Sequence, residues 1–582
     1  MSEPQAISRN IFKLGAAALL FSLPAYSAHA ELPRAFDLAS TSSSGNYLAA
    51  RIAGAGRDMA ASSAYYRAAL RADPSNPELI ERAFLVTLAS GAVEDSLLLA
   101  ERVILFDKNH RIARLALGVK GIKSGQFPQA RTHLGLAIRG PIADLTSTLL
   151  TGWSFYGSNN VAGATAHIDK LSGPDWYAVF KDLHAGMILD LGKQSKDALR
   201  RIERVRALDP NSLRTVDTYG RMLSRAGRND EALKVYADFS RVLARHPLVV
   251  SAVDELKAGK KLAPLAKNAA EGAAEALFGL GTALGRQGGE DLGLIYLQLA
   301  IYLAPEHPLA VLAVGDLFET LKKYELAIQA YERVPQTSPL RRNAEIQTAL
   351  NFDILEKKDE ARERLQALVK EKPDDIEGQT ALANVVRAGK RFPEAAEIYT
   401  RVIGMVGEIK REHWTLFYFR GISYERSKQW ALAEADFKKA LELFPDQPQV
   451  LNYLGYSWVD QGVNLDAALE MIRKAVALRP NDGYIVDSLG WAYYRLGKYA
   501  EAAIELERAV ELRPEDPTIN DHLGDVYWKT DRKLEEKFQW SHARDLKPEP
   551  EDLPKIEQKL KEGLIEDTAP PRAEETKDPN KG

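Results

Sequence analysis

Residue types that often carry catalysis are present in this chain but do not gather into a site. The histidines after residue 30 occur singly, and no pair has the spacing that lets two side chains bind a metal from one helix face. Ser423 and Ser457 fall inside expected helices, whereas the serine of a nucleophile elbow needs a strained turn. We therefore expect no catalytic residue, no metal site and no cofactor.

The glycines at 279, 281 and 285 superficially resemble a dinucleotide-binding loop. Such a loop needs a preceding strand and a helix amino terminus that holds the pyrophosphate. Residues 279–285 instead lie within an expected helix, so we interpret these glycines as packing positions.

Residues 483–516 show the element that repeats along the chain. Two runs of apolar or small residues at helical spacing flank Gly497, which predicts two helices and a turn, and Pro514 ends the second helix. One such hairpin cannot bury its own apolar faces and needs a copy on each side. The two runs are Leu489, Gly490 and Tyr493, then Ala502, Leu506 and Ala509.

This order of residues resembles the tetratricopeptide repeat, whose period is 34 residues. The next copy, around Gly524, is displaced from Gly490 by that period, and the small residue of the first helix can be followed back to Ala50. The resemblance implies an all-α fold, an α-α superhelix or solenoid of about fourteen helical hairpins in two lobes.

We expect five segments along the chain, the first of which is an export signal at residues 1–30. Residues 31–245 form an amino-terminal repeat lobe, 246–272 an irregular break, and 273–564 a carboxyl-terminal lobe that ends in a capping helix over 551–564, whose charged face includes Glu557 and Lys559. Residues 565–582 are expected to be disordered. The break is interpreted as a repeat that has lost most of its second helix, and an inert insertion loop is the alternative.

Residues 1–30 have the pattern of an export signal. Arg9 and Lys13 precede an apolar run over 14–23, and Ala28-His29-Ala30 forms a small-x-small cleavage site. We expect a periplasmic protein of a bacterial cell envelope, with an uncleaved membrane anchor as the alternative. No other segment is apolar enough to form a transmembrane segment.

Cysteine is absent from the chain, which excludes disulfides, thiol catalysis and a lipid anchor on a cysteine. The formal net charge is -3 over 582 residues. Because this balance is near neutral, we expect no nucleic acid among the partners.

A stack of helical hairpins offers an extended concave wall for protein binding. In tetratricopeptide proteins particular positions of each first helix line that wall, and the resemblance assigns a protein-binding groove here. Large aromatic residues with arginine are typical of interaction hot spots, although some of them could instead fill gaps between hairpins. The groove residues are Tyr456, Tyr484, Trp491, Tyr494, Arg495 and Trp528.

A second candidate patch lies in the amino-terminal lobe. It combines Trp153 and Tyr156 with the basic residues Arg214, Arg221 and Arg225. The alternative is that these arginines form an ordinary solvated face.

Two short segments carry a further resemblance. Residues 454–458 and 487–494 are similar to the carboxyl-terminal half of bacterial cell-envelope adaptors that dock carboxy-terminal processing proteases. The resemblance implies a non-enzymatic periplasmic scaffold or adaptor, with an envelope protease, its client or an assembly factor as the protein partner. The alternatives are a purely structural envelope-assembly protein and an enzyme subunit that acts on envelope polymers.

Overall fold

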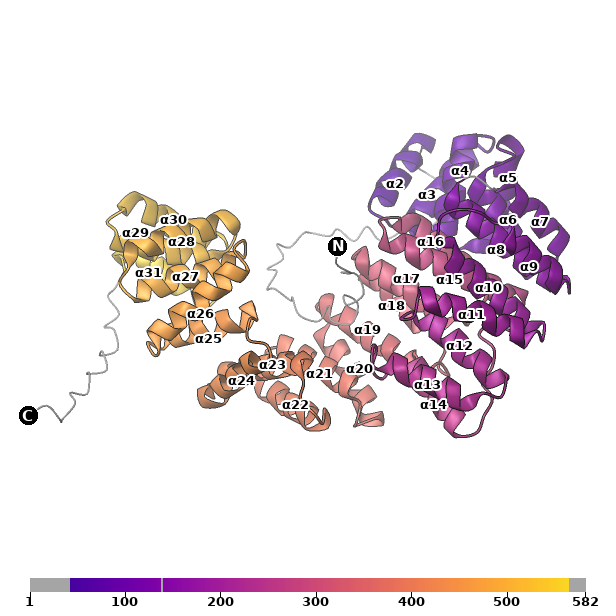
Figure 1. Ribbon diagram of the computed structural model, residues 1–582. Helices are drawn as coiled ribbons and strands as arrows, with labels where there is room; N and C mark the ends of the chain where they lie inside the picture. Colours follow the sequence, from indigo (N-terminus) through magenta and orange to yellow (C-terminus); the bar gives the residue numbers. More distant parts are fainter. Residues whose placement is uncertain (1–41, 138–139, 565–582) are drawn as a thin grey trace, which may run out of the picture. The chain divides into compact units, whose positions relative to one another are not determined.

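The computed structural model describes residues 42–137 and 140–564, and within these ranges every regular element is a helix (Figure 1). The predicted all-α fold is confirmed: consecutive helices pair into fourteen hairpins, and α14 and α31 stand outside the pairs. The predicted export signal at 1–30 and the predicted disordered tail at 565–582 lie outside the described residues.

The small residue of each first helix explains the repeat. A Cβ atom on Gly490 would lie 2.5 Å from Cγ of Leu506, and one on Gly524 would lie 2.4 Å from Cδ1 of Trp540. At these two positions the second helix can therefore pack this closely only against glycine. Gly497, in the turn of the same hairpin, has a φ of +73°, which glycine adopts without strain.

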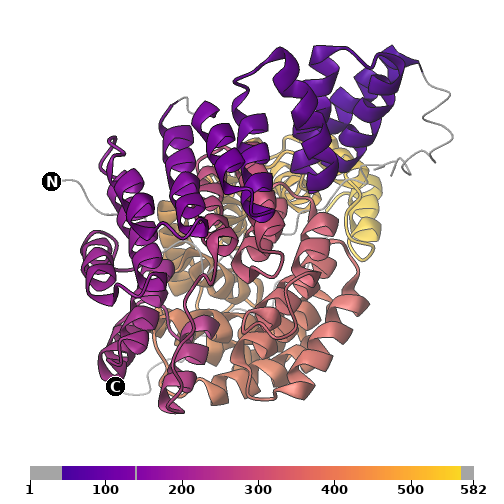
Figure 2. The same ribbon diagram turned by 90° about the vertical axis from the view of Figure 1, so that its right-hand side faces the viewer.

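The chain divides into two units, and the boundary lies between Ala344 and Glu345. The helices of the first unit form a curved stack in two perpendicular views (Figures 1 and 2). They are α2 (Ser43–Ala55), α3 (Met59–Ala72), α4 (Pro77–Ala89), α5 (Val93–Phe106), α6 (Arg111–Lys123), α7 (Phe127–Leu136), α8 (Pro141–Gly157), α9 (Val161–Asp169), α10 (Tyr177–Leu191), α11 (Ser195–Leu208), α12 (Leu213–Arg225), α13 (Asn229–Ser240), α14 (Pro247–Lys257), α15 (Ala269–Arg286), α16 (Glu290–Leu303), α17 (Pro308–Thr320) and α18 (Tyr324–Glu332).

The predicted division into lobes at 246–272 is not where the structure divides. The segment contains α14, then residues 258–268 without helix, and then the first turn of α15, which packs against α8 and α10 from before the segment. Residues on both sides of the break thus share one hydrophobic core.

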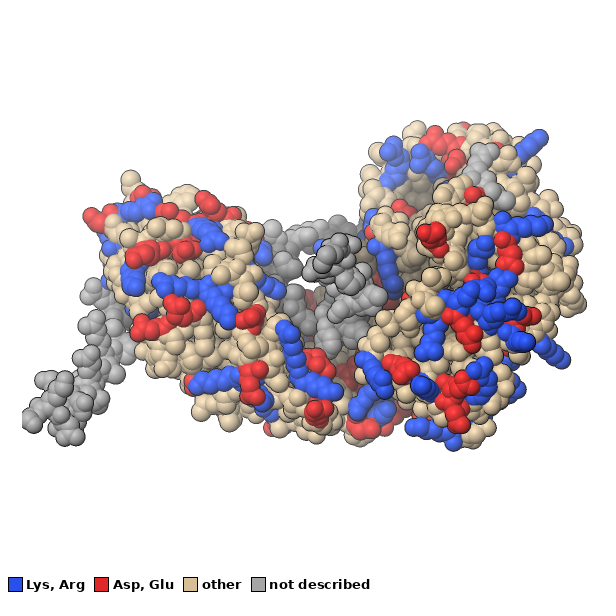
Figure 3. Space-filling model, in the orientation of Figure 1, with Lys and Arg blue, Asp and Glu red and all other residues tan. Residues whose placement is uncertain are grey.

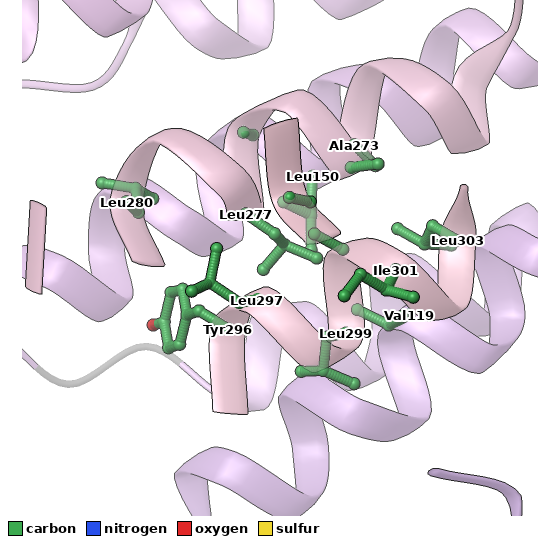
Figure 4. Packing of buried hydrophobic residues seen from close by; sticks show 14 of the residues in the cluster. Val119, Leu150, Ala273, Leu277, Leu280, Tyr296, Leu297, Leu299, Ile301 and Leu303 are labelled. Atoms are coloured by element: carbon green, nitrogen blue, oxygen red, sulfur yellow. The ribbon is translucent and has the colours of Figure 1, made fainter. Parts of the chain in front are cut away.

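Helices α15 and α16 fill the inner face of the first unit, which we define as the face formed by its first helices α4, α6, α8 and α10. Helix α15 contacts α6, α8 and α10, and α16 contacts α4 and α6. Figure 4 shows Val119 of α6 and Leu150 of α8 among the apolar side chains of α15 and α16. The inner face of this unit is therefore core rather than open surface.

The sequence of α16 agrees with this burial. Nearly all residues from Gly293 to Leu303 are buried, including Leu294, Leu297 and Leu299. A helix that is apolar on every side belongs inside a protein, because it has no polar face to turn toward water.

The second unit is also built from helical hairpins, and the residues of helix α19 span the boundary at 344–345. Among its described residues, the extensive contacts join only helices close in sequence, so no later helix covers the first helices α21 to α27. The helices are α19 (Arg341–Ile354), α20 (Lys358–Glu371), α21 (Ile376–Ala388), α22 (Phe392–Met405), the 3-10 helix η1 (Arg411–His413), α23 (Trp414–Arg426), α24 (Trp430–Leu443), α25 (Pro448–Asp460), α26 (Leu465–Leu478), α27 (Gly483–Arg495), α28 (Tyr499–Leu512), α29 (Pro517–Lys529), α30 (Lys533–Asp545) and α31 (Leu553–Glu562).

Helix α31 lies where a capping helix is predicted. Lys559, however, is predicted on the charged face of this helix and does not face water: its Nζ donates to Asp521 at 2.8 Å and to Asp525 at 2.9 Å. Ile556 of the same helix is buried with Trp540. The cap is therefore held by an ion-pair cluster as well as by apolar contact.

Candidate protein-binding surfaces

The residue that directly follows the small residue of a first helix points to the inner face. In the first unit this position holds Val119 and Trp153, which pack among or against α15 and α16. In the second unit the same position holds Tyr456 and Trp491. Since the repeat geometry is shared and no later helix covers α25 and α27, these two aromatics line an uncovered inner face.

Trp491 is the centre of a three-ring stack. Its ring centroid lies 4.7 Å from that of Tyr494 and 4.1 Å from that of His522, and both pairs are nearly parallel. His522 belongs to the next first helix, so the stack also joins two repeats. The indole Nε1 of Trp491 has no hydrogen-bond partner among the described residues.

His522 is held by an acidic neighbour. Its Nδ1 lies 2.9 Å from Oδ1 of Asp487. Burial lowers the pKa of His522, but Asp487, assisted by Asp521 and Asp525, outweighs burial and keeps the pKa above its ordinary value. A protonated His522 over the indole face of Trp491 adds cation–π attraction to the stack.

The remaining predicted groove residues have mixed settings. Tyr456 is partly buried, and burial raises the pKa of its hydroxyl. Arg495 lies 3.6 Å from Asp460, so its charge is partly compensated. Tyr484 packs beside Val486 and Ile519 between two repeats, which is the gap-filling alternative considered for this set.

Trp528 is covered by the chain's own cap. A Cβ atom on Gly563 would lie 2.1 Å from its ring, and Lys533 places its ammonium 3.5 Å above the ring. Nearby, burial raises the pKa of Asp525 to about 6, although Lys559 opposes this shift. Because the cap covers Trp528, the open part of the second unit's inner face is formed by the first helices α25 and α27 rather than by α29.

The structure brings the predicted amino-terminal patch together but places its tryptophan in the core, so Trp153 is not a surface residue. Its side chain is 0% exposed, its ring packs on Gly272 of α15, and its Nε1 donates to Nδ1 of His184 at 3.1 Å. Tyr156 meets the edge of the same ring. The physical reason is that α15 occupies the inner face.

The arginines of this patch are engaged in ion pairs within the unit. Arg221 Nε donates to Asp217 at 2.8 Å, and Arg225 Nε lies 2.9 Å from Oδ2 of Asp190. Arg214 forms an ion pair with Glu275 of α15. The basic patch therefore stabilises the first unit by compensating its own buried carboxylates.

Glu275 and His522 are two residues that the sequence analysis missed. Glu275 is buried, and its carboxylate accepts from Arg214 and lies 3.0 Å from Nε2 of His307. The available signal was its position as the one acid among the small and apolar residues of 272–281. For His522 the signal was its place one residue after Asp521, in the helix that follows Asp487 and Trp491.

Acidification should destabilise the first unit through His184. Burial lowers the pKa of His184 to about 4, below the value of about 6.5 for an exposed histidine. Because the pKa of His184 is lower in the folded than in the unfolded protein, its contribution to the free energy of unfolding is fully present above pH 6.5. This contribution is lost as the pH falls toward 4. By pH 5 the loss should be about 2 kcal/mol.

Hydrogen exchange of α8 and α10 at pH 7 and pH 5 measures this loss. A His184→Gln variant provides the control, because glutamine accepts from Trp153 but does not titrate. The variant should lose about 2 kcal/mol less stability than the wild type over this pH interval. Equal pH dependence in both proteins would show that His184 is not the titrating group.

The second unit matches known repeat families. Residues 490–531 match the model described as "TPR repeat", and residues 354–407 and 418–483 match the model described as "Tetratricopeptide repeat". The chain therefore contains tetratricopeptide repeats, and this part of the prediction is confirmed. Proteins built from such repeats are generally non-enzymatic scaffolds with protein partners.

Individual relatives share either a short segment or a low sequence identity with this chain. TPR repeat-containing protein PA4667 of Pseudomonas aeruginosa is 38% identical over 98 residues, which is 17% of this chain and 17% of that relative. The crystal structure of the APC/C hetero-tetramer Cut9-Hcn1 covers 78% of this chain and 97% of its own, with 15% identity and a TM-score of 0.38. A tetratricopeptide repeat protein from Parabacteroides merdae covers 50% of this chain and 97% of its own, with 16% identity and a TM-score of 0.34.

The described residues contain neither a cluster of metal-ligand side chains nor a helix that could span a membrane. Within 42–137 and 140–564, no three histidine, aspartate or glutamate side chains converge so that they could hold a metal ion. Across the same residues, none of the helices has both the length and the apolar character needed to cross a membrane.

Proposed function

We propose that the protein is a non-enzymatic scaffold that binds a protein partner on the inner face of its second unit. The observation that carries this proposal is the contrast between the units. Helices α15 and α16 fill the inner face of the first unit, whereas no later helix covers α25 and α27 in the described part of the second. Tyr456, Trp491 and Tyr494 are the aromatic residues of this surface.

The stack around Trp491 suits this role. A partner that docks here removes apolar aromatic surface from water without first ordering the rings, because His522 and Tyr494 already hold Trp491 in place.

We infer further that the scaffold acts in the periplasm and holds a client together with an envelope protease or assembly factor. The export pattern at 1–30 supports the compartment, and the likeness of 454–458 and 487–494 to envelope adaptors supports the partner. Amino-terminal sequencing of the protein from the envelope should begin at Glu31. A mature protein that retains residues 1–30 would contradict the inferred cleavage.

Affinity capture from envelope extracts tests the binding surface. The Tyr456→Ala, Tyr494→Ala double variant should bind the partner at least tenfold more weakly. Each substitution removes a hot-spot side chain that contributes about 1–2 kcal/mol to the binding free energy. Phe538→Ala is the matched control, since Phe538 is 66% exposed on α30 and lies outside this surface. If the double variant retains every partner, the assignment of the surface is wrong.

A further inference from the structure

Positive charge is concentrated in one part of the first unit. Residues 193–267 contain 17 lysines and arginines against 9 aspartates and glutamates, although the whole chain has a net charge of -3. On the face shown in Figure 3, lysines and arginines gather over the region of α11 and α12, with carboxylates between them. The near-neutral total therefore conceals a basic region.

A basic strap, residues 257–267, forms the most exposed part of this region. After α14 ends, the chain runs without helix across α12: the backbone N–H of Leu262 donates to Ser224 at 3.1 Å, and Arg221 donates to the carbonyl of Ala263 at 3.1 Å. Leu262 and Ala266 are each 1% exposed. The apolar side of the strap is thus anchored to the unit.

The charged side of the strap faces water. Lys257, Lys260, Lys261 and Lys267 are all exposed, and none has an acidic partner within ion-pair distance among the described residues. The strap borders α10, because Pro264 and Leu265 line a small hollow together with Asp190. Asp190 is already paired with Arg225, so it does not neutralise the strap.

Two ordinary explanations do not account for these lysines. A lysine at the carboxyl end of a helix compensates the helix dipole, and Lys257 has such a place in α14. Lys260, Lys261 and Lys267 lie outside any helix, however, and make no ion pair that would stabilise the fold. Three uncompensated cations on an anchored segment, with Lys257 beside them, are suited to an external anionic surface.

We propose that the basic strap docks the first unit on an anionic membrane surface. The strap has no aromatic residue for base stacking, and the hollow lined by its residues Pro264, Leu265 and Ala266 holds about 10 Å³, which is too small for a phosphorylated side chain. Flexible lysines without a pocket suit many dispersed lipid headgroups rather than one fixed ligand. This proposal is independent of the partner-binding surface in the second unit.

Co-sedimentation of the purified protein with vesicles tests the strap. Vesicles that contain phosphatidylglycerol should bind the protein at low salt and release it at high salt, and phosphatidylcholine vesicles should not bind it. The variant K257Q/K260Q/K261Q/K267Q should bind at least tenfold more weakly, since each lysine near an anionic surface contributes to the attraction. Hydrogen exchange of α10 and α12 verifies that the variant is folded.

The matched control is K370Q/K372Q/K537Q/K561Q, which removes the same charge from exposed lysines of the second unit. The control should bind like the wild type. Equal weakening of both variants, or binding that ignores lipid charge, would overturn the proposal. A protein that ignores the vesicles but binds polyglutamate through the strap would also overturn it, in favour of an acidic polypeptide partner.

Discussion

Replacement of Trp153 by alanine should lower the free energy of unfolding of the first unit by about 3–5 kcal/mol. Trp153 is fully buried between α8 and α15, where Gly272 leaves room for its ring. Alanine would leave a large cavity and would also deprive His184 of its hydrogen-bond donor. The effect should appear in urea unfolding and as faster hydrogen exchange in α8 and α15.

Trp176→Ala is the control for this experiment. Trp176 is 41% exposed and meets the rings of Tyr177 and Phe180 near the start of α10, so its replacement should cost about 1 kcal/mol or less. Similar costs for both variants would show that α15 does not pack on Trp153. The inner face of the first unit would then be open, contrary to the structure.

Replacement of Glu275 by glutamine should destabilise the same unit by about 3–5 kcal/mol, because the charge of Arg214 loses its buried partner. Burial alone would raise the pKa of Glu275, but Arg214 and His307 outweigh burial and hold the pKa at about 2. Since this acid's folded pKa is depressed, its stabilising effect is complete above the ordinary glutamate value. It is lost only as the pH falls toward 2.

Glu290→Gln provides the comparison. Glu290 pairs with Arg57 at 3.7 Å at the surface, and an exposed pair contributes about 0–1 kcal/mol. Chemical denaturation at neutral pH measures both variants. If Glu275→Gln costs no more than Glu290→Gln, the buried cluster does not hold α15 against α12.

The repeat itself was predictable from sequence because its packing is local. Gly490 and Leu506 meet within one hairpin, and their spacing recurs every 34 residues, so periodicity alone indicates which residues touch. The same logic predicts the inner position of Trp491. Its stacking on His522 joins adjacent repeats and therefore depends on a second hairpin.

The burial of Trp153 was not predictable from the repeat pattern. Trp153 and Trp491 have equivalent positions, yet one is core and the other lines an uncovered face. The difference depends on α15 and α16, which lie more than a hundred residues from Trp153 along the chain and fold back on earlier repeats. The apolar character of α16 on every side was the local sign of this long-range contact.

Site-specific photo-crosslinking tests the central claim most directly. Benzoylphenylalanine at position 494 of the full chain should form a covalent adduct with a partner protein in the cell, because that position lies on the uncovered inner face of the second unit. The same probe at position 538 on α30 should form none. Adducts at position 538 without adducts at position 494 would contradict the account.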